Sequence, residues 1–392
     1  MAEAFEINPK IIRWALERCD LSLTEISKKV DVAVERMESW LSGEAHPTFN
    51  QIMKLANGLH IPYGYLFLSK PPKEELVLPD LRALRRSRSQ KLSPEFHEVL
   101  DSALRKQDWY RDYLIAEGAG PLEFVGRFSM EDPIEEAANG IINVFGIDAE
   151  MRKQAKNWEQ FLQNMIFRIE HGGVIVLRSR YAGNNTNRTL SVDEFRGFAI
   201  SDKYAPFIFI NGNDAKAAQI FTTVHELAHI MIHESGVSNL DLRRGTSPSS
   251  KIESFCNQAA AEVLVPKKLF YREWKQAADL NNNLSHLSRT FRVSNLVVLK
   301  RAYDLEKINR EEYHEAYDRW AEDYKNREKK STAKSRGGDF YRSLFVRNSP
   351  LLSSCIVSAA LEGKLLYRDA ASLFDSQNTT LITKAANELG FV

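Results

Sequence analysis

The sequence predicts an α+β protein that is mostly helical, with a small sheet in its middle third. Apolar residues recur at helical spacing over residues 8–68 and again around 221–233 and 252–265. Between residues 174 and 210, three short apolar runs have the length and composition of buried strands. We expect five parts, which are a helical domain at 1–70, a linker at 71–93, a domain containing the sheet at 94–308, a charged connector at 309–336 and a helical C-terminal domain at 337–392.

The composition is that of an ordinary globular protein, with 43% hydrophobic and 27% charged residues. The 53 basic and 52 acidic residues leave a formal charge of +1, so only a local patch could favour nucleic acid. No apolar run has the length of a membrane helix, and the first residues lack the pattern of a signal peptide. The three cysteines do not suggest a disulfide framework. We therefore expect a cytoplasmic protein without a membrane partner.

The first domain is predicted to consist of short helices separated by tight breaks, with Ser42-Gly43 ending the third helix. Residues 23–32, followed by a second helix at 33–41, resemble the helix-turn-helix of the Cro/C1-type (XRE) phage-repressor family. The resemblance covers residues 8–68 and implies a five-helix domain that binds double-stranded DNA.

The second helix of this motif is unusually acidic for a DNA reader. Its outward positions include Glu35, Arg36 and Glu38, whereas major-groove readers usually present Arg, Lys, Asn or Gln to the bases. Lys28, Lys29 and Arg36 could still contact phosphates. Two functions stay open for residues 1–70. The domain either binds DNA through these three cations, or it binds a protein or forms a homodimer.

The linker contains a basic run that we interpret as solvated rather than as an arm contacting phosphates. This run consists of Arg82, Arg85, Arg86, Arg88 and Lys91. Beyond it, helical spacing predicts a long amphipathic helix at 94–117 and further helices near 132–145 and 149–170. Strands are predicted at 174–177, 198–200 and 207–210, and Asp214 is the expected cap of the helix that follows. An exposed edge of this sheet could hold an extended peptide.

Residues 221–233 (FTTVHELAHIMIH) have the spacing of a metal site. His225 and His229 are four residues apart, so on a helix they lie on one face and can bind one metal ion. Two neutral imidazoles and a third ligand hold Zn²⁺ with one position open. The ion lowers the pKa of its bound water to about 7, and Glu226 would accept the proton as general base. Because the flanking residues are apolar nearly all round, the helix is expected to be buried, and its polar side chains then need partners.

The third ligand is expected on the helix at 252–265. Glu253 and Asn257 are four residues apart, so Asn257 could brace Glu253 as a zinc ligand. Glu262 is the alternative; it lies nine residues further on and is not expected to bind the same ion as Glu253. We favour Glu253.

Four other side chains near this motif are given lesser roles. Cys256 is predicted to pack in the core, and His233 to cap or support the site rather than bind the metal. His286 and Tyr303 are both candidates for stabilising an oxyanion, and the sequence does not choose between them.

The run from Phe221 through HELAH, followed by ExxCNxxAAEVLVP at 253–266, resembles the ImmA/IrrE family of metallo-endopeptidases. The resemblance implies a gluzincin-like zinc enzyme, often fused behind a repressor-type domain. It further implies His225, His229 and Glu253 as ligands and Glu226 as general base. The implied reaction is hydrolysis of a peptide bond in a repressor or another regulatory protein.

The C-terminal third carries less information. Residues 304–335 are highly charged and predict a solvated helix, and residues 367–377 resemble the first half of another helix-turn-helix. Two functions follow for the whole chain. It is either a transcriptional regulator with an endopeptidase domain, or an antitoxin or DNA-binding repressor of a toxin–antitoxin operon whose zinc site is structural, latent or stress-activated.

Overall fold

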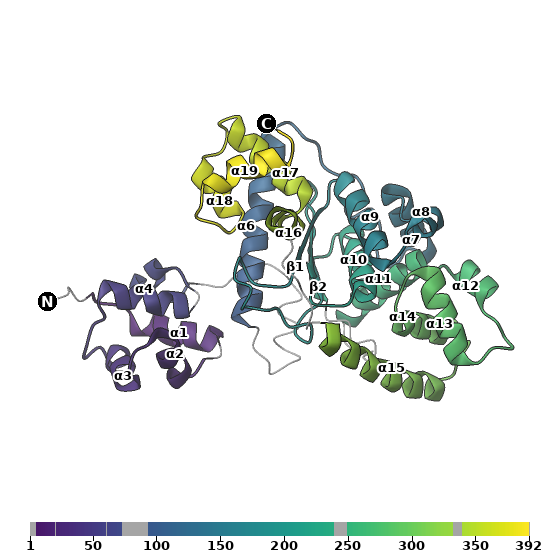
Figure 1. Ribbon diagram of the computed structural model, residues 1–392, viewed down its shortest axis with the longest axis horizontal. Helices are drawn as coiled ribbons and strands as arrows, with labels where there is room; N and C mark the ends of the chain where they lie inside the picture. The colour runs from purple at the N-terminus through teal and green to yellow at the C-terminus, as the bar shows by residue number, and fades with distance from the viewer. Residues whose placement is uncertain are drawn as a thin grey trace. The chain divides into compact units, whose positions relative to one another are not determined.

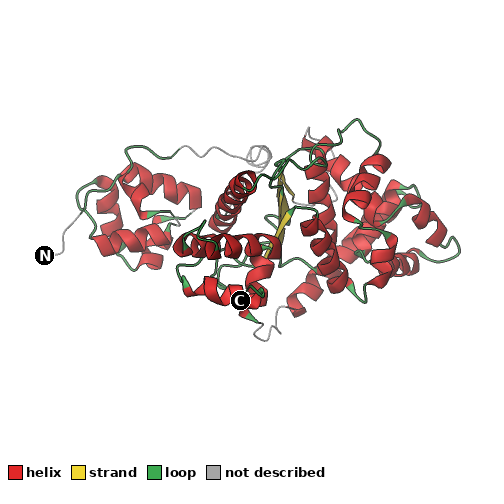
Figure 2. Ribbon diagram, turned by 90° about the horizontal axis from the view of Figure 1, so that it is seen from above, coloured by secondary structure: helices red, strands yellow, loops and turns green. Residues whose placement is uncertain are grey.

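A computed structural model describes residues 5–19, 21–59, 61–72, 93–238, 249–331 and 339–391. The chain forms two compact units, Met1–Asp101 and Ser102–Val392. Both views show mostly helices, with one small sheet, as the α+β prediction states (Figures 1 and 2). The predicted basic run at 82–91 lies outside the described residues.

The first unit contains short helices around one apolar core. Its elements are α1 (Pro9–Cys19), α2 (Leu23–Val30), α3 (Val34–Ser42), α4 (Phe49–Gly58) and the 3₁₀ helix η1 (Tyr63–Phe67). Ser22 and Glu25 form a reciprocal capping box at the start of α2. Gly43 ends α3 in the left-handed conformation, as Ser42-Gly43 predicts. The helices of the expected helix-turn-helix are therefore present, and the family of this domain stays a prediction.

The second unit is built around a four-stranded sheet with the order β1-β3-β2-β4. The strands are β1 (Ile175–Ser179), β2 (Gly197–Ile200), β3 (Phe207–Asn211) and β4 (Gly236–Ser238). β1 and β3 are parallel, whereas β2 is antiparallel to both β3 and β4. Three of these strands lie where the sequence predicts. β4 is not foreseen because it has one strongly apolar residue, Val237, and it becomes a strand by pairing with β2.

Helices cover the sheet and extend beyond it. They are α6 (Pro94–Ala116), α7 (Ile134–Phe145), α8 (Ala149–Gln154), α9 (Trp158–His171), α10 (Lys216–Met231), α11 (Ser249–Leu264), α12 (Lys267–Glu273), α13 (Leu280–Phe291), α14 (Asn295–Asp304), α15 (Arg310–Ser331), α16 (Phe340–Asn348), α17 (Pro350–Leu361), α18 (Tyr367–Leu373) and α19 (Thr380–Glu388). The prediction of one helix at 149–170 is wrong. Asn157 starts a new helix there, because its side chain accepts a hydrogen bond from the Gln160 amide at 2.9 Å.

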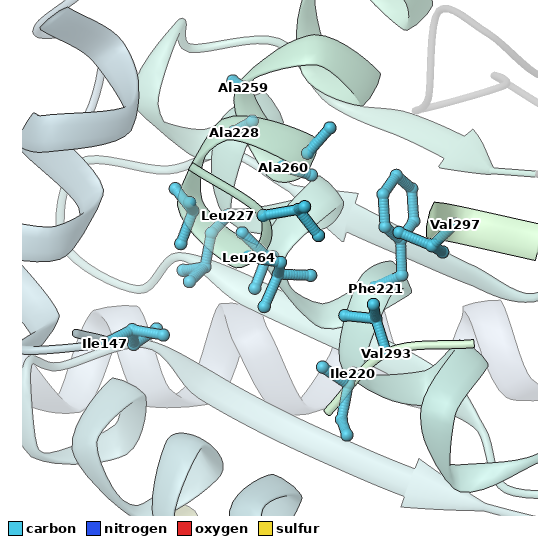
Figure 3. Close-up of a cluster of buried hydrophobic side chains, with 14 of the residues drawn as sticks. Ile147, Ile220, Phe221, Leu227, Ala228, Ala259, Ala260, Leu264, Val293 and Val297 are labelled. Carbon is cyan, nitrogen blue, oxygen red and sulfur yellow. The ribbon is translucent and has the colours of Figure 1, made fainter. Parts of the chain in front are cut away.

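The core of the second unit holds α10 against the sheet and against α11. In Figure 1, α7 to α11 lie on one side of the sheet and α6 with α16 to α19 on the other. Figure 3 shows small and branched side chains gathered where the helices meet, including Ala228 of α10 and Ala259 and Ala260 of α11. Alanines at a helix contact let two helix axes approach closely. This packing positions residues of α11 beside the metal-motif face of α10.

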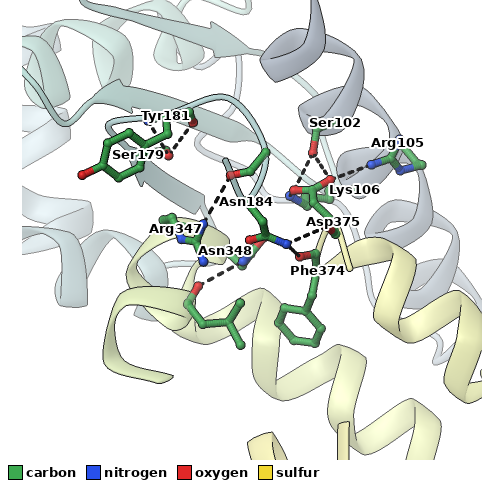
Figure 4. A network of polar contacts seen from close by, with 12 residues as sticks. Ser102, Arg105, Lys106, Ser179, Tyr181, Asn184, Arg347, Asn348, Phe374 and Asp375 are labelled. Atoms are coloured by element: carbon green, nitrogen blue, oxygen red, sulfur yellow. Dashed lines mark hydrogen bonds and ion pairs between the residues drawn. The ribbon is translucent and has the colours of Figure 1, made fainter. Parts of the chain in front are cut away.

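The C-terminal helices are attached to the same unit by a polar network (Figure 4). The carboxylate of Asp375 accepts hydrogen bonds from Lys106 Nζ at 2.6 Å and from Ser102 Oγ at 2.9 Å. The Arg105 guanidinium lies 2.8 Å from the same carboxylate. Lys106 has only 3% of its side chain exposed, so its charge depends on this partner.

The charged stretch after α14 is partly built into the core. Tyr313 and Ala316 of α15 are buried, and the ring of Tyr313 lies 4.9 Å from that of Tyr303. The prediction of a solvated helix therefore fails for the first turns of α15. Charge composition conceals their apolar stripe, which repeats at 313, 316, 317 and 320.

Among the described residues, no single helix is long and apolar enough to cross a membrane. One bent pair, α16 with α17, passes that test by length and composition when the two helices are taken together across their 100° bend.

Candidate metal centre

Helix α10 carries both histidines of the predicted metal motif. The helix starts after Ala215, so the prediction that Asp214 is its cap is wrong. Instead, the buried Asp214 carboxylate accepts a hydrogen bond from Arg196 Nη1 at 2.6 Å. From Gln219 to Met231 every residue of α10 is buried, as the apolar flanks of the motif predict. The histidines are thus held on a rigid and fully covered helix.

The structure brings His225, His229 and Glu253 together in one group. The two Nε2 atoms are 3.1 Å apart. Oε2 of Glu253 lies 3.3 Å from Nε2 of His225, and Oε1 of Glu253 lies 3.2 Å from Nε2 of His229. Among the described residues, these three side chains are the ones whose ligating atoms lie close enough together to hold one metal ion.

These distances fit a tetrahedral ion such as zinc. Zinc binds imidazole nitrogen and carboxylate oxygen at about 2.0–2.2 Å, so two tetrahedral ligands are roughly 3.3–3.5 Å apart. Oε1 of Glu253 and the side-chain oxygen of Asn257 are buried without a hydrogen-bond partner in the described part of the chain. A buried cluster of two imidazoles around a carboxylate is what a divalent cation would satisfy.

The electrostatics favour an ionised Glu253. Burial alone would raise the pKa of its carboxyl, but His225 and His229 outweigh burial and hold that pKa well below its usual range. Glu253 is therefore in the charged form that a metal ligand requires, on a helix whose position is set by the core.

Glu226, the expected general base, is fully buried and lies beside strand β2. A Cβ atom added at Gly197 would stand 3.1 Å from Oε1 of Glu226 and 2.8 Å from the carbonyl oxygen of Phe209. β2 can pass this close to α10 because residue 197 has no side chain. Sequence reasoning did not identify Gly197, since an isolated glycine before an apolar strand carries no distinctive signal.

The two candidate acidic ligands on α11, Glu253 and Glu262, differ in the residues that they contact. Glu262 is paired with Arg301 of α14, and its carboxylate also accepts a hydrogen bond from the Lys267 amide at 3.0 Å. Its carboxylate is thus engaged on α14 and α12 rather than in the histidine group. Asn257 is one turn from Glu253, yet no hydrogen bond from its side chain to Glu253 is present among the described contacts.

The remaining predicted residues lie outside the histidine group. His233 follows the end of α10 with a positive φ of 55° and its Nδ1 is 2.9 Å from Ser201 Oγ, which is a capping position. Cys256 is buried in the core, where its thiol forms a hydrogen bond with the His229 side chain. His286 lies 3.6 Å from Glu273, and the ring of Tyr303 packs on Tyr313. The choice between these two oxyanion candidates stays a prediction.

Three cations were expected to contact DNA. Lys28 and Lys29 lie in the last turn of α2 and Arg36 in the first turns of α3, and all three are exposed. They belong to the first unit, so they form a group separate from the metal centre.

Comparison with known families agrees with the geometry of α10 and α11. Residues 174–303 match the family described as the IrrE N-terminal-like domain (Peptidase_M78). The matched stretch contains the sheet, both histidines, Glu226 and Glu253. No curated protein matches the chain. The match supports an ImmA/IrrE-type metallopeptidase domain over residues 174–303.

Proposed function

We propose that this protein is a zinc-dependent endopeptidase that hydrolyses a peptide bond in a protein substrate. The observation that carries the proposal is the group of His225, His229 and Glu253, with their ligating atoms 3.1–3.3 Å apart. Its position on α10 and α11, inside the matched peptidase domain, supports a catalytic rather than a purely structural site.

In this proposal His225, His229 and Glu253 hold the zinc ion. A bound zinc ion would supply a Lewis acid and an acidified water. Glu226 would accept a proton from the attacking water and pass it to the amine that leaves. Its burial against β2 excludes other water from the carboxylate, which favours proton transfer to and from substrate.

The proposed substrate is a repressor or another regulatory protein bound in extended form. β4 is an edge strand of the sheet, and β2, beside Glu226, is its partner. A substrate segment could add to this edge by main-chain hydrogen bonds. Ser238 of β4 lies opposite Gly197 of β2, and Gly197 lies against Glu226, so this edge runs close to the proposed general base.

The test is a comparison of new protein N-termini in cells that express the wild type or Glu226→Gln. We expect one or a few cleavages that need both Glu226 and zinc. Glu150→Gln, at an exposed position of α8, is the matched control and should cleave as the wild type does. Continued cleavage by Glu226→Gln would contradict the mechanism. A tight complex with an uncleaved toxin, unaffected by Glu226→Gln, would favour the antitoxin alternative.

We further propose that residues 1–70 bind double-stranded DNA through phosphates. The supporting observation is that Lys28, Lys29 and Arg36 are exposed on the two helices of the expected helix-turn-helix. Because Glu35 and Glu38 are exposed on the same helix as Arg36, base readout is expected to contribute little. The triple variant Lys28→Gln, Lys29→Gln, Arg36→Gln should lose affinity and flatten the salt dependence of binding to the protein's own promoter. Unchanged binding would exclude these three cations from the interface. Failure of the wild type to bind that DNA at low salt would leave protein binding or dimerisation as the role of this domain.

A further inference from the structure

A cavity lies at the N-terminal end of α10, the helix that carries His225 and His229. It is a cavity of about 710 Å³, within the roughly 300–1,000 Å³ of small-molecule sites. Its wall includes the residues just after β1 and β3, Arg180 and Asn213, and the first residues of α10. Ala217 in this wall precedes His225 by eight residues, which is roughly 12 Å along a helix. None of the metal ligands lines the cavity.

The cavity is cationic. Arg180, Lys216 and Arg289 line it, and among the described lining residues Asp214 is the one acid. The Asp214 carboxylate is already held by Arg196 at 2.6 Å, so it does not neutralise the three cations. The cavity therefore presents a net positive surface to whatever enters it.

Charge behind the wall adds to this excess. Lys216 and Arg178 share one carboxylate, that of Glu159, at 3.2 and 3.7 Å. Nη1 of Arg178 is buried without a hydrogen-bond partner in the described residues. Burial, and then the nearby Arg178 and Arg180, lower the pKa of Lys216. A bound anion would relieve this crowding of positive charge.

Backbone N–H groups in the cavity wall also carry partial positive charge. The first residues of α10, 215–217, and of α14, 294–296, line the cavity. The first-turn N–H groups of a helix have no partner within the helix and carry partial positive charge, so they bind phosphate groups well. Here two helices, of 16 and 10 residues, begin at the same cavity.

Two indole rings provide an apolar part of the wall. Trp158 and Trp320 line the cavity together with the side chain of Leu296. Trp158 is 41% exposed, so a substantial part of its surface is open to a ligand. Indole faces stack well on planar rings. The cavity thus combines a cationic region with a surface for a flat group.

We propose that this cavity binds a small organic phosphate carrying a planar ring, of the nucleoside phosphate class, with its phosphate near Arg180, Lys216 and Arg289 and its ring against the indoles. The site is distinct from the metal centre and shares α10 with it. The inference stands on the cavity alone and does not require the peptidase activity.

The test is titration of the full-length protein with ADP, with adenosine and inorganic phosphate as comparators. Tryptophan fluorescence and calorimetry report binding without any cleavage assay. We expect saturable ADP binding with a change in fluorescence, and at least about tenfold weaker binding of adenosine and of phosphate. Absence of saturable ADP binding at millimolar concentration would overturn the proposal. Equal affinity for adenosine and ADP would overturn the role of the cations.

Variants locate the site. Arg180→Gln with Arg289→Gln should weaken ADP binding by at least about tenfold, because charge-assisted contacts to phosphate are removed. Trp158→Phe should reduce the fluorescence change. Arg368→Gln, 77% exposed on α18, is the control and should bind ADP as the wild type does. Unchanged affinity in the double variant, with its circular dichroism intact, would place any ADP site elsewhere. Tight binding of an acidic peptide in place of ADP would overturn the choice of ligand.

Discussion

Gly197 and Glu226 lie against each other across the interface between β2 and α10. A Cβ atom at residue 197 would be 3.1 Å from Oε1 of Glu226 and 2.7 Å from Cγ2 of Thr222. Thr222 is one turn before Glu226 on α10, so the strand contacts the helix along the face that carries the carboxylate. The orientation of the proposed general base thus depends on the absence of a side chain at residue 197.

We predict that Gly197→Ala impairs both folding and cleavage. The added methyl would stand 2.8 Å from the Phe209 carbonyl oxygen and 2.7 Å from Thr222 Cγ2, so both the strand and the helix must shift. Overpacking of this kind costs about 1–3 kcal/mol of unfolding free energy. Denaturant unfolding measures the loss. Gly120→Ala, with open space around its Cβ, is the control and should change little. Wild-type stability in Gly197→Ala would show that β2 has room to move.

The assignment of Glu253 over Glu262 predicts opposite phenotypes. Glu253→Gln should lower zinc affinity by more than about 100-fold, since loss of an outer partner alone costs 10–100-fold. Glu262→Gln should keep zinc affinity and lose about 3 kcal/mol of stability, because the buried Arg301 guanidinium loses its carboxylate. Competition with a zinc-binding dye and denaturant unfolding separate the two effects. The reverse pattern would assign the ligand to Glu262.

The polar network in Figure 4 predicts that Asp375 holds the C-terminal helices in place. Asp375→Asn keeps a residue that tolerates the positive φ of 54° but leaves the buried Lys106 without a carboxylate. We expect a loss of about 3 kcal/mol in unfolding free energy. Asp108→Asn, an exposed position on the same helix as Lys106, should stay within about 0.5 kcal/mol. Equal effects from the two changes would refute a structural role for the network.

Glu170 predicts a dependence of stability on pH. Burial raises the pKa of its carboxyl to about 7, although Ser349 and the Val176 amide donate hydrogen bonds to it. Between about pH 4.5 and 7 the folded state keeps a proton that the unfolded state releases, so stability falls as pH rises through this window. Glu170→Gln should therefore be stabilising by up to about 3 kcal/mol at pH 8 and by much less at pH 5. Denaturant unfolding at both pH values gives this difference. The same gain at both would mean that Glu170 does not titrate in this range.

Local sequence patterns determined the elements that position the metal group. The i, i+4 spacing of His225 and His229 and the apolar residues around them predict a buried helix with both imidazoles on one face, and the structure has this helix with the two Nε2 atoms 3.1 Å apart. The choice between Glu253 and Glu262 could be favoured from the sequence but not settled. It depends on Arg301, 39 residues after Glu262, which pairs with Glu262 through tertiary packing.

The sequence does not predict features that depend on contacts between distant parts of the chain. β4 has too few apolar residues to be predicted, and it forms because Gly197 and Phe198 of β2 lie opposite Ser238 and Val237. The contact between Gly197 and Glu226 likewise depends on tertiary packing, because it joins a strand to a helix that is distant in the sequence. The cationic cavity joins segments near residues 158, 180, 213, 289 and 320, and no short motif links them.

The central claim is that His225, His229 and Glu253 together bind one zinc ion. The most direct measurement is the zinc content of the purified full-length protein after zinc loading and dialysis, with X-ray absorption spectroscopy to count its ligands. We predict one zinc per chain with two imidazole nitrogens and carboxylate oxygen in its shell, and loss of that zinc in His229→Ala. A wild-type protein that retains no zinc, or a His229→Ala variant that retains it fully, would contradict the account.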